Sequence, residues 1–294
     1  MAAHTQPLWP SRRQRGRRSY WLTANSEVTI GTLVVAGIAL LAVLAPLLSS
    51  FHPDTIDLTS RLSPPGARHW AGTDELGRDI WSRTLFGTRL SLLMGAGISS
   101  IGCAVGSLLG AAAPVLGRWW DEILMRAIDV LMALPTMVVA MALTVALGPN
   151  LLNAMFALGV LSIPHFARIV RAQTLAVVQQ EHYSASILMG GGKWHLLINN
   201  VLPNIIGSVS VLFSMHLGTS VLAASAVSFI GLGAQPPTAE LGAMINAGRA
   251  YLLDQWWYVV APGVVLTSLV CGCNLLGDGL REFFDPRAQT FGVA

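Results

Sequence analysis

The chain has 294 residues, of which 53% are hydrophobic and only 11% are charged, and its formal net charge is +3. Soluble domains typically carry about 25% charged residues, so this composition excludes an ordinary soluble domain and predicts a membrane protein. The small net charge gives no sign of a nucleic-acid partner. The three cysteines lie in apolar stretches, and Cys271 and Cys273 would point to different faces of a helix. They predict neither a disulfide nor a metal site.

The first 26 residues form a basic tail without an acidic residue. Its arginines are Arg12, Arg13, Arg15, Arg17 and Arg18. The charge-free run from Val28 to Pro53 is longer than the apolar region of a signal peptide, which spans about 7 to 15 residues. We therefore expect a cytoplasmic tail over residues 1–27, attracted to anionic membrane lipid, and then an uncleaved membrane helix.

Charge-free runs long enough for membrane helices, about 20 residues each, follow along the chain. They cover residues 28–53, 90–117, 130–164, 196–239 and 255–277. The turn signal Gly148-Pro149-Asn150 splits the third run into helices near 130–147 and 151–168. The sequence predicts an all-α, polytopic fold with six transmembrane helices. The expected polar connections lie near residues 54–89, 118–129, 169–203 and 234–254.

Lysines and arginines are concentrated in the tail and in alternate connections. The positive-inside rule then places both termini in the cytoplasm, with the chain crossing the membrane several times. On this topology, residues 28–89 hold the first helix and an extracytoplasmic loop. Residues 90–280 form a five-helix core, residues 169–203 a cytoplasmic loop and residues 281–294 a cytoplasmic tail.

A polar island, "EHYSASILMGGGKWHLLINNVLPN" over residues 181–204, interrupts the apolar pattern. Its Gly190-Gly191-Gly192-Lys193 is not a phosphate-binding loop, because Trp194 stands where such a loop needs Ser or Thr. Apolar residues recur at roughly helical spacing before the glycines. The glycines allow a tight reversal, and Pro203 would end or kink the following helix. The pattern predicts a helix–turn–helix, which is either a plain connector or a functional loop.

Polar side chains inside membrane helices are costly and therefore informative. His216 lies in the middle of a predicted helix, and Asn153 lies near the outer end of another. Each is a candidate for lining a translocation path, although a hydrogen bond between helices is the favoured interpretation. His165 lies close to a predicted helix end, and Asp129 is expected to pair with Arg126. No cluster has metal-ligand spacing, and no catalytic arrangement indicates an enzyme.

Five segments spread along the chain share the motifs of one family. They are "HWAGTDELGRDIWSRTLFGTRLSL" (69–92), "MRAIDVLMALPTMVVAMALTVALGPNLLN" (125–153), "IPHFARIVRAQ" (163–173), "SFIGLGAQPPTAELGAMI" (228–245) and "NLLGDGLREFFDPR" (274–287). From about residue 28 to residue 289, the chain resembles the permease subunits of ATP-binding-cassette (ABC) importers. It is most similar to the C-type subunit of the dipeptide, oligopeptide and nickel branch. The resemblance implies the type I importer permease fold and a place in the inner membrane of a bacterial cell.

The cytoplasmic loop of this family carries the motif E-A-A-x-x-x-G and then I-x-L-P. The corresponding residues here are Ser184, Ala185, Ser186, Gly190, Leu202 and Pro203, with Asn200 in place of the isoleucine. The resemblance implies that the loop from Glu181 to Pro203 forms coupling helices in a groove of an ATPase subunit. The serine that replaces the first motif glutamate removes an anchor for that contact.

The resemblance also implies the partners and the cofactors. The chain would form a heterodimer with a second, B-type permease, above one or two ATPase subunits that bind ATP and Mg²⁺. An extracytoplasmic binding protein would deliver the cargo, and this chain itself would hold no cofactor. The expected cargo is a dipeptide or short oligopeptide, with nickel, a metal chelate or glutathione as the alternative. A secondary transporter or channel, which needs no ATPase, is the alternative of another class.

Overall fold

Long apolar helices make up most of residues 26–284, the part of the chain that the computed structural model describes. They are α2 (Ser26–Val43), α3 (Ala45–Leu48), α4 (Ile80–Leu116), α5 (Arg118–Met132), α6 (Thr136–Leu147), α7 (Leu151–Val178), α8 (Glu181–Leu188), α9 (Lys193–His195), α10 (Leu202–Phe229), α11 (Leu241–Gly248) and α12 (Trp257–Phe284). Short 3₁₀ segments are η1 (Leu58–Ser60) and η3 (Arg249–Tyr251), and η2 (Leu196–Val201) is a π-helical segment. The basic tail and the predicted C-terminal tail lie largely outside the described residues.

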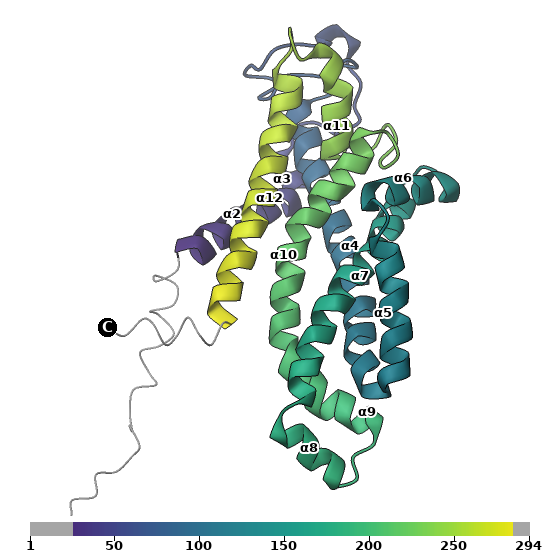
Figure 1. Ribbon diagram of the computed structural model, residues 1–294. Coiled ribbons are helices and arrows are strands. Elements are labelled where there is room, and N and C mark those ends of the chain that lie inside the picture. Colours follow the sequence, from purple (N-terminus) through teal and green to yellow (C-terminus); the bar gives the residue numbers. More distant parts are fainter. Residues whose placement is uncertain (1–25, 285–294) are drawn as a thin grey trace, which may run out of the picture.

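The helices form an elongated bundle, with α8 and α9 at one end and α11 at the other (Figure 1). Four helices in the described range are long and apolar enough to cross a membrane: α4, α7, α12 and the helix from Lys193 to Phe229. The pair α5 and α6 makes a fifth if it is counted as one bent span, and the apolar part of α2 is shorter. The all-α, polytopic class is confirmed, whereas the number of six transmembrane helices is not.

The third predicted span differs from expectation, because the predicted connection 118–129 is helical. Residues 118–132 form α5, and α6 follows after a bend of 88°. Pro135 lies at the bend, where its ring prevents a continuous helix. Charged residues on α5 had suggested a loop, but two of them pair with arginines of α7 instead.

Two of these ion pairs hold α5 against α7. Arg171 donates from Nε and Nη2 to the two carboxylate oxygens of Asp121, at 2.5 and 2.6 Å. Arg168 pairs with Asp129. The expected pair between Arg126 and Asp129 is therefore wrong, because Arg126 lies 3.5 Å from Glu122 one turn earlier.

Loss of the bidentate pair should destabilise the bundle more than loss of the exposed one. Arg171→Met is expected to lower the free energy of unfolding by about 1.5–3 kcal/mol, because it leaves Asp121 without its charged hydrogen bonds. Arg126→Met should cost less than about 1 kcal/mol, as is usual for an exposed pair. Thermal unfolding of both purified variants in detergent compares them directly. Equal costs would show that the Arg171–Asp121 pair does not hold α5 in place.

The second membrane helix begins at Ile80 rather than near residue 90, and α7 runs to Val178 rather than ending near 168. Asp79 caps α4, since its carboxylate accepts from the Ser82 backbone N–H at 2.7 Å. Arg83 is tolerated inside the helix because it is buried with partners. Its guanidinium donates to the carbonyl of Pro53 at 2.9 Å and lies 3.2 Å from Asp54.

Helix α4 approaches α7 closely through three glycines spaced four residues apart, Gly102, Gly106 and Gly110. A Cβ added to Gly106 would lie 2.6 Å from the carbonyl oxygen of Ile163, and one added to Gly110 would lie 2.4 Å from that of Ala167. Small residues at this spacing let two membrane helices touch along their backbones. This glycine stripe therefore fixes the distance between α4 and α7.

The predicted connection 234–254 contains the short helix α11, which a buried carboxylate anchors. Glu240 is 1% exposed and caps α11 by accepting from the Ala243 N–H at 2.9 Å. Its other oxygen accepts from Ser91 of α4 at 2.9 Å and from Ser225 of α10 at 3.0 Å. The three hydrogen bonds compensate the burial of the charge and join α11 to two long helices.

Polar contacts also order the segment between α3 and α4. Arg78 donates to the buried Asp74 at 2.6 Å. Hydrogen bonds from Ser60 and Thr59 lower the pKa of Asp57 to about 2. The α11 end of the molecule is thus a hydrogen-bonded cap on the bundle.

Candidate functional site

The polar island folds as the predicted helix–turn–helix. Helix α8 ends at Leu188, the chain reverses through the glycines, and α9 leads through η2 into α10. Gly190 has a φ of 84°, a left-handed conformation that favours glycine. Its N–H donates to the carbonyl of Ile187 at 2.9 Å. The expected reversal is therefore confirmed, and we call residues 181–203 the α8–η2 loop.

Pro203 does not end the second helix of this loop. The π-helical segment Leu196–Val201 directly precedes the turn that contains Pro203. The helix therefore continues without a break from Lys193 to Phe229. A π turn widens the helix by one residue, which accommodates a residue without a backbone donor. The loop is therefore joined to a long membrane helix without a break.

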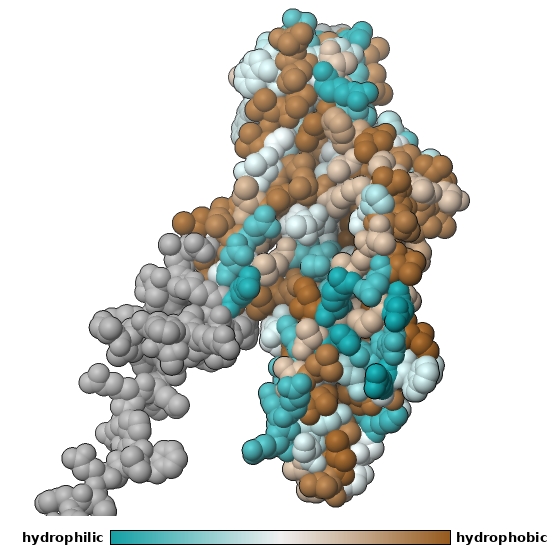
Figure 2. All heavy atoms as spheres, in the orientation of Figure 1, coloured by the Kyte–Doolittle hydropathy of each residue, from teal (hydrophilic) through white to brown (hydrophobic). Residues whose placement is uncertain are grey.

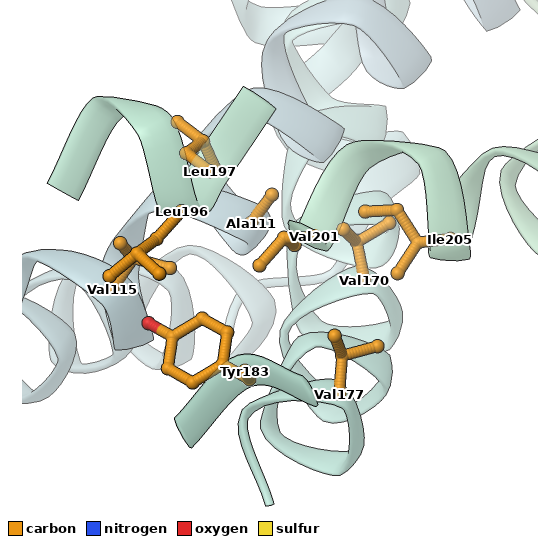
Figure 3. Packing of buried hydrophobic residues seen from close by; sticks show 9 residues of the cluster. All are labelled: Ala111, Val115, Val170, Val177, Tyr183, Leu196, Leu197, Val201 and Ile205. Atoms are coloured by element: carbon orange, nitrogen blue, oxygen red, sulfur yellow. The ribbon is translucent and has the colours of Figure 1, made fainter. Parts of the chain in front are cut away.

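A hydrophobic cluster fastens the α8–η2 loop to the bundle (Figure 3). Its buried members are Ala111, Val115, Val170, Val177, Tyr183, Leu196, Leu197, Val201 and Ile205. They come from α4, α7, α8, η2 and α10. Tyr183, the one buried residue of α8, is 5% exposed, and burial raises the pKa of its phenol. The ring of Tyr183 therefore links the loop to three long helices.

Lys193 adds a polar tether between the loop and α4. Its ammonium group donates to the carbonyl oxygen of Leu116 at 2.7 Å. Leu116 is the last residue of α4, where carbonyl groups lack helical partners and attract cations. The lysine that a phosphate-binding loop would use is thus hydrogen-bonded to the end of α4.

The tip of the loop exposes large apolar side chains. Leu188 is 88% exposed, Met189 81% and Trp194 71%. Figure 2 shows hydrophobic and hydrophilic surface side by side at this end of the molecule. Exposed apolar groups gathered on one projecting loop are typical of a protein-binding surface.

The candidate loop residues lie together, although not all on the exposed surface. Glu181, Ser184, Ala185, Gly190 and Pro203 are exposed, whereas Ser186 and Leu202 are half-buried. The Ser186 hydroxyl donates to the carbonyl of His182 at 3.1 Å, inside its own helix. Leu202 packs against the hydrophobic cluster.

A cavity of about 950 Å³ lies along α7 and α10, beside the bend between α5 and α6. In Figure 2 the middle of the molecule is recessed, and pale and hydrophilic atoms lie there among hydrophobic ones. His216 lines the cavity and lies 2.9 Å from Ser220 Oγ and 3.4 Å from Ser99 Oγ. It therefore makes a hydrogen bond and also faces the cavity.

Asn153, the other candidate for a path, lies elsewhere. Its side-chain amide donates to the carbonyls of Leu147 and Gly148 at 2.7 and 2.9 Å, which closes the turn between α6 and α7. It is not among the residues that line the cavity. The favoured hydrogen-bonding role of Asn153 is therefore confirmed, with backbone partners in a turn.

His165 lines the same cavity, and the sequence interpretation placed it at a helix end instead. Because α7 extends to Val178, His165 lies well inside the helix, and its ring centroid is 5.5 Å from that of His216. Gln173 also lines the cavity, and its Oε1 is buried without a hydrogen-bond partner. His165, Ile169 and Gln173 are four residues apart and line the same cavity. This helical spacing was the signal in the sequence that α7 extends beyond residue 168.

Residues 102–290 match the family described as the inner-membrane component of binding-protein-dependent transport systems. The chain is 41% identical over 291 residues to the probable D,D-dipeptide transport system permease protein DdpC of Escherichia coli K12, with 98% of each chain covered. It is 35% identical to the dipeptide transport system permease protein DppC of Alkalihalophilus pseudofirmus, over 92% of this chain and 88% of the relative. It is 38% identical to the glutathione transport system permease protein GsiD of Pectobacterium atrosepticum, over 93% of this chain and 92% of the relative.

The chain therefore belongs to the family of inner-membrane components of binding-protein-dependent transport systems. It is a multi-pass membrane protein and a permease subunit of an ABC transporter, in which a separate subunit hydrolyses ATP. Such a permease works with an ATPase and a substrate-binding protein.

Proposed function

We propose that this chain is one of two permease subunits of an ATP-driven importer for dipeptides or short oligopeptides. Two of the relatives are named dipeptide permeases, and one is named a glutathione permease. Glutathione is itself a short peptide, so all three names favour peptide cargo over nickel or a chelate. Both termini lie in the cytoplasm, and a B-type permease forms the other half of the path.

The α8–η2 loop is the coupling element of this proposal. The observation that carries it is an exposed apolar tip, with Leu188 and Trp194, on a loop that Tyr183 and Lys193 fasten to the bundle. Such a tip suits a groove on the ATPase, which binds ATP and Mg²⁺. The chain has serine at the first motif position, so apolar contact supplies the affinity that a glutamate would add.

The cavity is this chain's part of the translocation path. His216 lines it, and its walls include apolar side chains such as Met132, Met137 and Leu158. A wall in which apolar side chains outnumber polar ones suits cargo of varied side chains, because the binding protein selects the cargo before it arrives. Asn153, the other candidate for the path, does not line this cavity and donates its amide to the α6–α7 turn.

Uptake into vesicles that carry the complete importer tests the proposal. Labelled dipeptide, glutathione and nickel are compared with and without ATP. Gly190→Pro should reduce dipeptide uptake by about tenfold or more while the complex still assembles, because proline cannot adopt a positive φ and strain of this kind costs about 1–3 kcal/mol. Gly192→Ala is the matched control, because an added Cβ there meets nothing within 4 Å and the φ is −72°.

Each other outcome contradicts a named part of the proposal. Uptake without the ATPase would replace the importer by a channel or secondary transporter. Uptake of nickel alone would refute the peptide cargo. Equal uptake by Gly190→Pro and Gly192→Ala would show that the reversal of the loop is not needed for coupling.

A further inference from the structure

We propose that His165 and His216 form a recognition point for the carboxylate of the cargo peptide inside the cavity. This inference rests on the proposed peptide importer and adds to it a residue-level site in this chain. It starts from the ring pair, whose centroids are 5.5 Å apart and whose planes differ by 32°. The two rings come from different helices, α7 and α10, and both line the cavity.

Phe166 supports both imidazoles from behind. Its ring is fully buried, with its centroid 4.9 Å from that of His216 and 6.1 Å from that of His165. The glycine stripe of α4 lets this ring pack tightly, since a Cβ on Gly106 would lie 2.7 Å from Phe166 Cβ. The pair is therefore supported by a buried aromatic ring that packs closely against α4.

Two serine hydroxyl groups contact Nδ1 of His216. Ser220 Oγ lies 2.9 Å and Ser99 Oγ 3.4 Å from Nδ1, and the two hydroxyl oxygens lie 2.9 Å from each other. With a serine hydroxyl donating to Nδ1, the proton of the neutral ring is on Nε2. Ser99 and Ser220 are therefore positioning residues, which leave His216 one ring N–H for a ligand.

His165 is exposed to the cavity and has no hydrogen bond to any residue between 26 and 284. A neutral imidazole still donates one N–H. The pair thus presents two donors, one of them fixed in position by serine hydroxyls. Donors that converge in a mostly apolar cavity are how ligand sites set orientation.

The charges of the lining favour an anionic group over a cation. Arg281 also lines the cavity, and no aspartate or glutamate is found among the described residues around it. Two histidines without a third ligand make a poor metal site, and residues 26–284 contain no group of three or more metal-ligating side chains. The geometry therefore points to a carboxylate, which every unmodified peptide carries at its C-terminus.

The buried Oε1 of Gln173, which lacks a donor, supplies the complementary contact. Gln173 lies eight residues beyond His165 on α7, about 12 Å along the helix axis. An extended peptide of three or four residues spans about 10–14 Å. Such a peptide could donate an N–H to Gln173 while its carboxylate meets the histidines.

The test compares uptake of alanyl-alanine and of its C-terminal amide by the complete importer in proteoliposomes. Only this chain is mutated, so the preference of the binding protein affects every acid-to-amide ratio equally. His165→Phe keeps a ring against Phe166 but removes the donor, and it should lower the ratio about tenfold, as expected for one hydrogen bond to a charged group. His165→Asn, which keeps a donor, should recover part of the ratio. His52→Phe, at an exposed histidine outside the cavity, should leave it unchanged.

A second measurement removes the binding protein altogether. Thr219 is an exposed residue of the cavity lining. In a chain whose three cysteines are replaced by alanine, Thr219→Cys is alkylated in the permease–ATPase complex. The dipeptide acid should slow alkylation more than the amide does, and His165→Phe should abolish the difference. A structural role for His165 would lower the rates without changing the preference for acid over amide.

The outcomes separate this inference from the proposed function. One contrary result is that His165→Phe leaves the preference for acid over amide unchanged both in ATP-dependent uptake and in protection from alkylation. That result would overturn the carboxylate site and leave the proposed importer unaffected. Absence of ATP-dependent peptide uptake by the unmutated complex would overturn both. Nickel uptake that depends on the pair, with peptide uptake unaffected, would replace the carboxylate by a metal ion.

Discussion

Gly106→Leu is expected to abolish folded, monodisperse permease. The added Cβ would lie 2.6 Å from the Ile163 carbonyl oxygen and 3.1 Å from the Ala167 nitrogen, and both are backbone atoms. Backbone cannot rotate away as a side chain can, so α7 must move off α4 along its length. Overpacking of this kind typically costs about 1–3 kcal/mol, and more where the backbone blocks relaxation. Size-exclusion chromatography in mild detergent measures the loss.

The matched control is Gly263→Leu, because a Cβ at that glycine of α12 meets nothing within 4 Å. This control should give a normal elution profile. If Gly106→Leu eluted like Gly263→Leu, contact along the glycine stripe would not determine the spacing of α4 and α7. Gly106→Ala should give an intermediate yield, since it adds the Cβ alone.

Tyr183→Ala is expected to uncouple ATP hydrolysis from uptake while the complex still assembles. Removal of a buried aromatic side chain costs about 3–5 kcal/mol. This substitution weakens the packing of α8 against the ends of α4 and α7, where Tyr183 belongs to one buried cluster with Val115 and Val177. Uptake per ATP hydrolysed in proteoliposomes should fall at least tenfold, about the effect of 1.4 kcal/mol.

Tyr183→Phe is the control for this effect, because it keeps the ring and removes only the hydroxyl. It should retain most of the uptake per ATP. Equal losses in both variants would assign the role to the hydroxyl group instead of to packing. Normal coupling in Tyr183→Ala would show that the loop transmits movement by another route, of which the Lys193 tether to Leu116 is one.

The features that could be predicted from the sequence depend on neighbouring residues in the chain. The reversal at Gly190 and the helices on either side follow from local pattern, because glycine alone tolerates the required φ. Apolar runs likewise predict the long helices. The stripe of Gly102, Gly106 and Gly110 was not predicted, although its spacing is visible in the sequence and indicates a helix contact.

The features that were missed depend on partners far along the chain. The charged residues of α5 suggest a loop until Arg171 is found beside Asp121, 50 residues away. Helix α11 follows a segment rich in glycine and proline, and it is anchored by Ser91 of α4 through Glu240. The place of His165 in the cavity depends on where α7 ends. Its pairing with His216 connects residues that no local pattern relates.

Helix α4 makes hydrogen bonds at both ends of the bundle and in its middle. Ser91 bonds to Glu240 at the α11 end, Ser99 bonds to Ser220 beside His216, and Leu116 accepts from Lys193 of the loop. Its 37 residues span about 55 Å. One residue inserted between Ser91 and Ser99 would turn everything on one side by about 100° and shift it by about 1.5 Å. The three contacts can therefore form together only if the spacing of Ser91, Ser99 and Leu116 along α4 is kept.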